Sequence, residues 1–310
     1  MVLNEPLAVF AVAFGARWGL ARAADRVMCQ HMAPDAQIAK LIADIEFCHS
    51  AMLPGKRLPL AAGPNQFGYV QPELAARLRA VDLAIEISSA GVTMPQALLP
   101  RLNELAAAVG IPTRAEDFDV RATPEGEVLG VLDRGALPSF GVIGVGVHLN
   151  GLVHKPDGLH LWVAKRAANK KLDPGKLDHL VAGGVPAGHS PFEALLKEAW
   201  EEAGLNQDAA AKAREVARFR YNMERPEGLR RDLVYAYDLE LPADFTPRPM
   251  DGEVESFMLW PLEHVKQELL TSGNFKFNVV LVLADLLLRH GLFTPGEAEQ
   301  LKNALYRKMV

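Results

Sequence analysis

Residues 183–205 read GGVPAGHSPFEALLKEAWEEAGL, and this stretch predicts a glycine-rich loop followed by a helix. Ser190 and Glu193 have the spacing of a capping box, and Pro191 suits the first helical position, where its missing N–H costs no hydrogen bond. Gly204 can adopt the left-handed backbone conformation that ends many helices. The start and stop signals therefore agree on a helix of roughly three to four turns.

The faces of this predicted helix differ in chemistry. An apolar stripe should pack on a core and consists of Phe192, Leu195, Leu196, Ala199 and Ala203. Glu198, Glu201 and Glu202 are spaced i, i+3 and i+4 and share the adjacent face, where like charges repel. The helix dipole disfavours anions near the C-terminal end, and only Lys197 is placed to offset them. The cluster therefore indicates an external cation, and carboxylate oxygens favour Mg²⁺ or Mn²⁺.

A solvated helix face is the alternative explanation of the three glutamates, but the glycines at both ends of the stretch favour a metal site. The stretch resembles the Nudix box, Gly-x5-Glu-x7-Arg-Glu-U-x-Glu-Glu-x-Gly-U, in which U is a bulky aliphatic residue. The matching residues are Gly183, Glu198, Glu201, Glu202, Gly204 and Leu205. Three positions depart from the box: His189 replaces its first Glu, Lys197 its Arg, and Ala199 its first aliphatic residue. Lysine keeps the charge of arginine but not its forked geometry.

The resemblance implies a hydrolase of diphosphate linkages. Its fold would be an α/β (α+β) structure, a Nudix α/β/α sandwich with a mixed sheet, preceded by a small α+β domain. The implied cofactor is Mg²⁺, with Mn²⁺ as the alternative. The implied catalytic residues are Glu198, Glu201, Glu202 and Lys197. The three glutamates would hold the metal, and Glu253 or Glu255 would supply a fourth carboxylate or a base, with an exposed strand edge as the alternative for that pair.

A basic loop precedes the glycine-rich stretch and contains Lys165, Arg166, Lys170, Lys171 and Lys176. Because this loop leads directly to Gly183, we expect it to face the phosphates, although solvated surface is an equal alternative. The predicted substrate-binding residues are Lys176, Lys165, Gly183, Gly184 and His189, and for His189 an ordinary loop position is the stronger alternative.

Further motifs resemble a Nudix subfamily related to the N-terminal part of fungal thiamine pyrophosphokinase, whose members carry an N-terminal domain of unknown function. They read GVHLNG at 146–151, LWVAKR at 161–166, DPGKLD at 173–178, EGLRRD at 227–232 and DGEVESF at 251–257. This resemblance implies that the substrate is thiamine diphosphate or its oxidised analogues, cleaved to the monophosphate in metabolite repair. In that subfamily the first Glu of the box is often not kept.

The composition of the chain limits its partners. The 310 residues are 49% hydrophobic and 23% charged, with a net charge of −5, which argues against binding nucleic acid through bulk charge. The only cysteines are Cys29 and Cys48, too few for a disulfide framework or a zinc site, so a cytoplasmic location is expected. No apolar run reaches the length of a membrane span. Residues 279–288 are apolar but contain Asp285, and we expect them to form a buried helix. The expected partner is a small-molecule diphosphate, and a homodimer is left open.

The chain divides into three predicted parts. Residues 1–31 form an extension, disordered or preceding the native start, and translation from Met32 is the simpler hypothesis. Residues 32–136 form the α+β domain, in which Thr93 and Gln96 match a second capping box and Pro100 would kink the next helix or mark its start. Residues 137–310 form the Nudix domain.

Other functions remain as alternatives. A Nudix hydrolase could act instead on a nucleoside diphosphate derivative such as ADP-ribose, on NADH or on a nucleoside triphosphate. An enzyme that resembles isopentenyl-diphosphate isomerase would need a cysteine in its site, and both cysteines precede residue 137. A non-catalytic ligand sensor would gain nothing from three carboxylates that repel one another.

Overall fold

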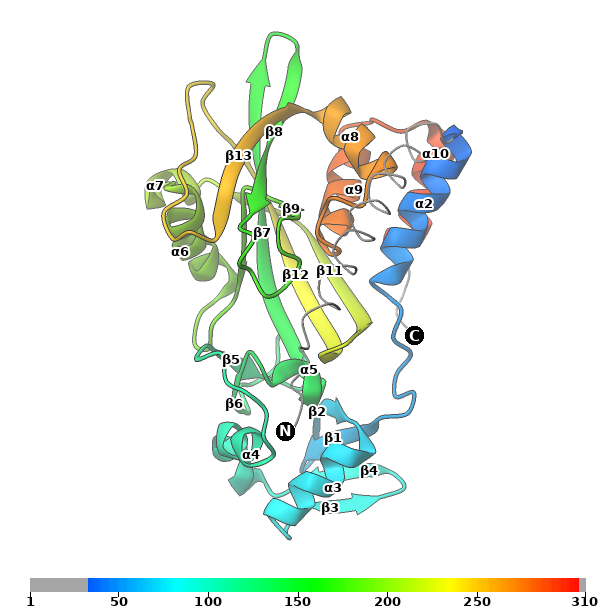
Figure 1. Cartoon of the computed structure of the whole chain (residues 1–310), viewed down its shortest axis with the longest axis vertical. Coiled ribbons are helices and arrows are strands. Elements are labelled where there is room, and N and C mark those ends of the chain that lie inside the picture. The colour runs from blue at the N-terminus through cyan, green and yellow to red at the C-terminus, as the bar shows by residue number, and fades with distance from the viewer. Residues whose placement is uncertain (1–32, 307–310) are drawn as a thin grey trace, which may run out of the picture.

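The computed structural model describes residues 33–306 and shows a mixed α/β fold (Figure 1). A twisted sheet stands between two groups of helices, and a smaller α+β unit lies at one end of the sheet. The predicted fold class, an α/β/α sandwich with a mixed sheet, is confirmed by this arrangement. The predicted extension at residues 1–31 and the proposed start at Met32 lie outside the described residues.

The main sheet has seven strands in the order β11-β12-β7-β8-β13, with β10 paired to β7 and β9 to β8. Strands β7 and β12 run parallel, whereas the other pairs are antiparallel. The bounds are β7 (Ile143–Lys155), β8 (Gly158–Arg166), β9 (Leu177–Asp178), β10 (Val181–Gly184), β11 (Arg214–Arg225), β12 (Gly228–Glu240) and β13 (Val254–Pro261).

Both faces of this sheet are covered, which explains the long apolar runs in its central strands. Val147 and Leu149 of β7 belong to the core beneath α6 (Pro191–Ala203) and α7 (Gln207–Ala210). Leu152 of the same strand belongs to the opposite core. That core is covered by α2 (Pro34–Phe47), α8 (Leu262–Thr271), α9 (Val279–Arg289) and α10 (Pro295–Leu305).

Helix α9 is the buried helix that residues 279–288 predicted. All its residues from Val279 to Leu287 are buried. Asp285 is only 2% exposed and accepts a hydrogen bond from Arg289 Nε at 2.7 Å, which satisfies its carboxylate inside the apolar core. Within residues 33–306, every helix is too short or too polar to cross a membrane.

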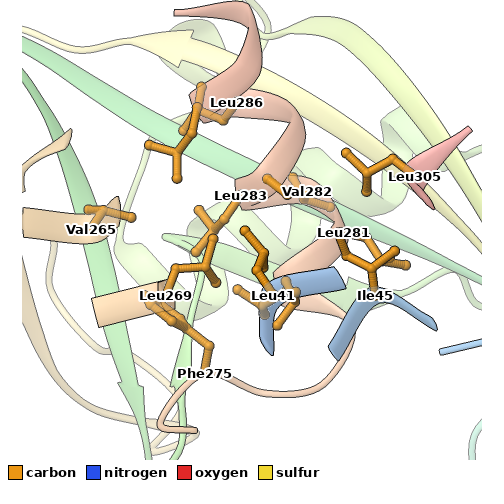
Figure 2. Packing of buried hydrophobic residues seen from close by; sticks show 14 of the residues in the cluster. Leu41, Ile45, Val265, Leu269, Phe275, Leu281, Val282, Leu283, Leu286 and Leu305 are labelled. Atoms are coloured by element: carbon orange, nitrogen blue, oxygen red, sulfur yellow. The ribbon is translucent and has the colours of Figure 1, made fainter. Parts of the chain in front are cut away.

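Helix α2 begins the chain that the structure describes, yet it packs in the core of the second half. Leu41 and Ile45 are fully buried in the cluster that contains α8, α9 and α10 (Figure 2). The division of the chain at residues 136 and 137 stays a prediction, and on these contacts we propose that α2 folds with the second half.

Replacing Leu41 with alanine should destabilise this helical layer. Leu→Ala at a fully buried site removes apolar contacts and leaves a cavity, so we expect a loss of about 2–5 kcal/mol in the free energy of unfolding. Glu46→Ala on the exposed face of the same helix is the control, with an expected change within about 0.5 kcal/mol. Urea unfolding followed by circular dichroism measures both. Equal stability of the two variants would contradict the placement of α2.

The first half forms a separate four-stranded sheet in the order β2-β1-β4-β3, and a two-stranded sheet pairs β5 with β6. Its core is a distinct cluster that includes Leu60, Phe67 and Leu102. The bounds are β1 (Leu58–Ala62), β2 (Asn65–Val70), α3 (Pro72–Val81), β3 (Glu86–Ser88), β4 (Gly91–Met94), the 3-10 helix η1 (Gln96–Arg101), α4 (Leu102–Ala108), β5 (Asp117–Val120), β6 (Gly130–Asp133) and α5 (Leu137–Phe140).

The predicted capping box at Thr93 is wrong. Thr93 lies inside β4, where it pairs with both β1 and β3, and Pro95 precedes η1 without a side-chain cap. Pro100 falls in η1 and α4 begins at Leu102, so this proline does precede the start of the α-helix. Tertiary strand pairing overrides the local capping signal here.

Candidate active site

The local signals at both ends of α6 are confirmed. Glu193 N donates to Ser190 Oγ at 3.2 Å and Ser190 N donates to Glu193 Oε2 at 2.8 Å, which completes the capping box. Gly204 ends the helix with a left-handed φ of 63°. The glycine-rich residues before the helix include β10, so part of the predicted loop is a strand paired with β7.

The buried face of α6 is rotated from the predicted stripe. Its buried residues are Ala194, Leu195, Ala199, Glu202 and Ala203. Phe192 is 37% exposed, so its assignment to the core is wrong. Phe192 lies in the first turn of the helix, where its ring centroid is 6.2 Å from that of Tyr237, whereas Ala194 and Glu202 join the buried face.

Two carboxylates of α6 lie against the backbone of β10. Glu202 is 5% exposed, and its Oε2 accepts a hydrogen bond from Ala182 N at 2.7 Å. Glu198 packs on Gly183, where an added Cβ would overlap the carboxylate and lie 2.7 Å from Oε2. Glycine is therefore required at residue 183, because any side chain would displace Glu198.

Both carboxylates hold their protons more tightly than an exposed glutamate does. Burial, followed by the neighbouring Glu198 charge, raises the pKa of Glu202 to about 8. Burial also raises the pKa of Glu198 to about 7, despite the opposing attraction of Lys197. Two neighbouring acids with raised pKa values are an unfavourable arrangement that a bound cation would relieve.

Glu201 is held differently from its neighbours. Its carboxylate is about 40% exposed and pairs with Lys197 Nζ at 2.6 Å, whereas Lys197 lies 4.0 Å from Glu198. Lys197 is therefore within ion-pair distance of Glu201 and Glu198, as predicted for the cation that offsets the acidic cluster.

The proposed fourth carboxylates also have lysine partners. Glu253 pairs with Lys170, and Glu255 pairs with Lys165 at 2.7 Å. As they are arranged, no three His, Cys, Asp or Glu side chains in residues 33–306 converge on a point that could hold a metal ion. The oxygen-only donor set of Glu198 and Glu202 fits Mg²⁺ or Mn²⁺, and Glu201 or Glu253 could join it only by leaving its lysine.

These groups line one cleft with a volume of about 620 Å³. Gly183, Gly184, Lys197, Glu198, Glu201 and Glu253 are all among its lining residues, and Glu202 lies buried beneath. The structure therefore brings together most of the predicted site. Lys165, Lys176, His189 and Glu255 are not among the lining residues of the cleft. His189 is exposed with Nδ1 3.2 Å from Ala187 O, and Lys176 Nζ donates to Gly273 O.

Sequence reasoning missed two parts of the cleft. One is a wall from the first half of the chain, formed by Arg114, Glu116, Phe118 and Arg134. The other is a set of polar residues on β11, β12 and the segment before α9, namely Tyr221, Arg230, Asp232, Lys276 and Asn278. The motif EGLRRD contains Arg230 and Asp232, so a signal was present for the second set, whereas no local pattern marked the first.

Cys48 lies outside this site. It is buried in the core beside α9, where Sγ donates to Phe277 O at 3.3 Å, and burial raises the pKa of its thiol to about 12. A protonated core thiol cannot serve the isomerase chemistry that needs a cysteine in the site. Cys29 lies outside the described residues.

We expect Mg²⁺ to stabilise the protein more at high pH. The pKa values of Glu198 and Glu202 are raised above the ordinary 4.5, so without metal their stabilising contribution is complete below about pH 4.5 and is lost as pH rises through 7 and 8. Metal binding needs the deprotonated carboxylates. The rise in melting temperature from EDTA to saturating Mg²⁺ should therefore be larger at about pH 8.5 than at about pH 6.

Thermal unfolding monitored by fluorescence measures this difference. Glu202→Gln removes one of the two titrating carboxylates and should reduce the Mg²⁺ effect at both pH values. A Mg²⁺ effect of equal size at both pH values in the wild-type protein would contradict the role assigned to the raised pKa values.

Part of the chain matches known proteins. Residues 147–279 match the model of the NUDIX domain. The chain is 41% identical to Nudix hydrolase 20, chloroplastic, and 40% identical to Nudix hydrolase 24, chloroplastic, both of Arabidopsis thaliana, in each case over 196 residues that make up 63% of this chain. These alignments cover 52% and 53% of the relatives, so the chain spans about half of their length.

Solved structures resemble part of the chain. One from Deinococcus radiodurans is 22% identical and covers 55% of this chain and 98% of its own, with a TM-score of 0.44. The NUDIX domain of Shewanella oneidensis NrtR, solved with ADP ribose, is 14% identical and covers 52% of this chain and 94% of its own, with a TM-score of 0.40.

Proposed function

We infer that this chain, whose residues 147–279 match the model of the NUDIX domain, is a divalent-metal-dependent hydrolase of a diphosphate linkage in a small molecule. The observation that carries this proposal is a pair of carboxylates, the half-buried Glu198 and the buried Glu202, that lie against the β10 backbone at the edge of a cleft of about 620 Å³. Two neighbouring carboxylates with raised pKa values, one of them buried, favour a bound metal over a purely structural role.

Mg²⁺ is the proposed cofactor, with Mn²⁺ as the alternative. Glu198 and Glu202 would hold it, with Glu201 as the third ligand, and Glu253, a lining residue whose charge raises the pKa of both Glu198 and Glu202, would add a fourth carboxylate. When bound, such an ion neutralises charge on diphosphate oxygens and lowers the pKa of a water molecule that attacks phosphorus.

The remaining roles belong to the chain itself. Ala182 N fixes the orientation of Glu202, and the missing side chain of Gly183 leaves room for Glu198. Lys197 Nζ lies 2.6 Å from Glu201 Oε2, and its positive charge would act beside that of the metal ion. Lys170 binds Glu253, so the approach of an anionic substrate would compete for Lys170 and free that carboxylate.

The proposed substrates are thiamine diphosphate and its oxidised analogues, as the sequence motifs between residues 140 and 260 suggest. ADP-ribose, NADH and nucleoside triphosphates form the comparison set, because each contains the same kind of phosphate anhydride linkage. A cytoplasmic location, the absence of nucleic-acid and membrane partners, and a homodimer stay proposals. The Arabidopsis relatives carry the word chloroplastic in their names.

The test is hydrolysis of this panel by the full chain, with Mg²⁺ and with EDTA, followed by chromatography of the products. The proposal predicts metal-dependent release of a monophosphate from thiamine diphosphate or an oxidised analogue. Hydrolysis of a nucleotide alone would support the proposed diphosphate hydrolase activity and rule out thiamine diphosphate as its substrate. No turnover of any member of the panel would reject the proposed function and favour a ligand-binding role.

A further inference from the structure

Most of the cationic side chains that line the cleft have a carboxylate partner. Arg134 pairs with Glu116 at 2.7 Å, and Arg230 pairs with Asp232 at 2.9 Å. The other paired cations of the lining are Lys197 with Glu201, Lys170 with Glu253, and Arg166 and Lys276 with Asp178. Because most lining cations are paired with a carboxylate, a lining cation without such a partner is available to bind an anionic ligand.

Two lining cations have no carboxylate partner in the part of the chain that the structure describes. They are Arg114 and Lys171, whose side chains form none of its ion pairs or hydrogen bonds, and both are exposed to the cleft. Glu198 lines the same cleft with Glu202 buried beneath it, and the ion-pair partner of Glu198 is Lys197 at 4.0 Å. A metal ion could bind the carboxylates of α6, and the phosphate groups of a ligand could bind the two unpaired cations of the same cleft.

The two cations come from different halves of the chain. Lys171 lies in the loop between β8 and β9. Arg114 lies just before β5 in the first half, and its backbone N donates to Asp133 Oδ1 at 2.8 Å. That hydrogen bond fixes the segment that carries Arg114 to the end of β6.

The first-half wall is attached to the glycine-rich loop that precedes α6. Ala187 N donates to Asp117 O at 2.8 Å, and Gly188 N donates to Asp119 Oδ1 at 3.2 Å. The Phe118 ring packs so closely on Gly184 that an added Cβ would lie 2.5 Å from it. Strand β5 is therefore attached to the loop that precedes α6, and Arg114, three residues before this strand, lines the same cleft.

We propose that Arg114 and Lys171 bind phosphate oxygens of the substrate's diphosphate, which makes the first half of the chain part of the substrate site. Arg114 suits this role because guanidinium can donate two parallel hydrogen bonds to a phosphate, and Lys171 adds a compact positive charge. The inference rests on the proposed function, since it assigns the ligand of that same cleft.

The experiment uses the full chain and imidodiphosphate, a diphosphate analogue that is not hydrolysed, with Mg²⁺ present. Isothermal titration calorimetry measures its dissociation constant for the wild-type protein, Arg114→Gln, Lys171→Gln and the double variant. Each single variant should weaken binding roughly tenfold, and the double variant roughly a hundredfold if the two act independently. In hydrolysis of the active diphosphate, each should raise KM with little change in kcat.

Arg101→Gln is the matched control. Arg101 is an exposed arginine of the first half that pairs with Glu104 at 2.8 Å and does not line the cleft, so binding should be unchanged. Arg114→Lys keeps the charge and should recover part of the affinity. Melting temperatures of all variants check that they fold.

The outcomes separate this inference from the proposed function. Unchanged imidodiphosphate binding in Arg114→Gln and Lys171→Gln, or no binding by the wild-type protein, overturns the inference even if a diphosphate is hydrolysed. Weaker binding in Lys171→Gln alone overturns the role of the first half. If both variants weaken binding but the wild-type protein hydrolyses nothing in the panel, the inference stands and the proposed hydrolase fails.

Discussion

Glu198→Gln is expected to lower turnover by about a thousandfold or more while the protein stays folded. Glutamine has the same shape but lacks the charge that would hold a divalent cation, and the loss of several kcal/mol of metal-based stabilisation corresponds to about this factor. Because burial raises the pKa of Glu198 to about 7, a neutral side chain at this site should cost the metal-free protein no stability. Initial rates with Mg²⁺, on whichever diphosphate the wild-type protein cleaves, measure the effect.

The control for this variant is Glu299→Gln, on the exposed face of α10 and away from the cleft. Its rate and melting temperature should match those of the wild-type protein. If Glu198→Gln retained wild-type turnover, Glu198 would not be a catalytic metal ligand, whatever its position beside Gly183.

Gly183→Ala is expected to lower kcat/KM by about a hundredfold, because the new methyl group would occupy the space of the Glu198 carboxylate. A displacement of about 1 Å in a catalytic group is enough for an effect of this size. Overpacking should also reduce the free energy of unfolding by about 1–3 kcal/mol. Kinetics at saturating Mg²⁺ and urea unfolding measure the two effects separately.

A second glycine provides the matched control. Gly296, in the first turn of α10, has no atom within 4 Å of an added Cβ, so Gly296→Ala should leave both activity and stability nearly unchanged. Normal activity of Gly183→Ala would show that Glu198 can leave its position on β10 without consequence, and this would contradict the geometry proposed for the site.

Short-range signals explain what the sequence predicted well. The capping box at Ser190 and Glu193 and the left-handed Gly204 involve residues within one helix, so local chemistry fixed both ends of α6. The apolar run at residues 279–288 likewise required no knowledge of its partners to be recognised as a buried helix.

Long-range packing explains what the sequence could not predict. Thr93 has a local capping pattern, but pairing with two strands distant in sequence decided its conformation. The buried Glu202 is hydrogen-bonded to Ala182 N, which lies 20 residues away, whereas Phe192, predicted to be in the core, is exposed in the first turn of α6. The hydrophobic periodicity and the helix propensity of a segment do not indicate contacts with residues distant in sequence.

The candidate site shows the same division. Glu198, Glu201 and Gly183, which the motif predicted as one site, line one cleft, because a loop and a helix join them. The basic loop was expected to face the phosphates, and only part of it lines the cleft. Lys170 and Lys171 do so, whereas Lys165 pairs with Glu255 outside the cleft. Arg114 precedes β5, which belongs to a different sheet, so its place in the cleft could be found only from the tertiary structure.

The most direct test of the proposed metal site is the position of Mn²⁺ in a crystal of the full chain grown with that ion. We expect an anomalous-scattering peak that contacts carboxylate oxygens of both Glu198 and Glu202, beside the β10 backbone at Gly183. A peak bound elsewhere in the cleft, or a site that stays without a peak at saturating Mn²⁺, would contradict the claim that the acidic face of α6 holds the catalytic metal.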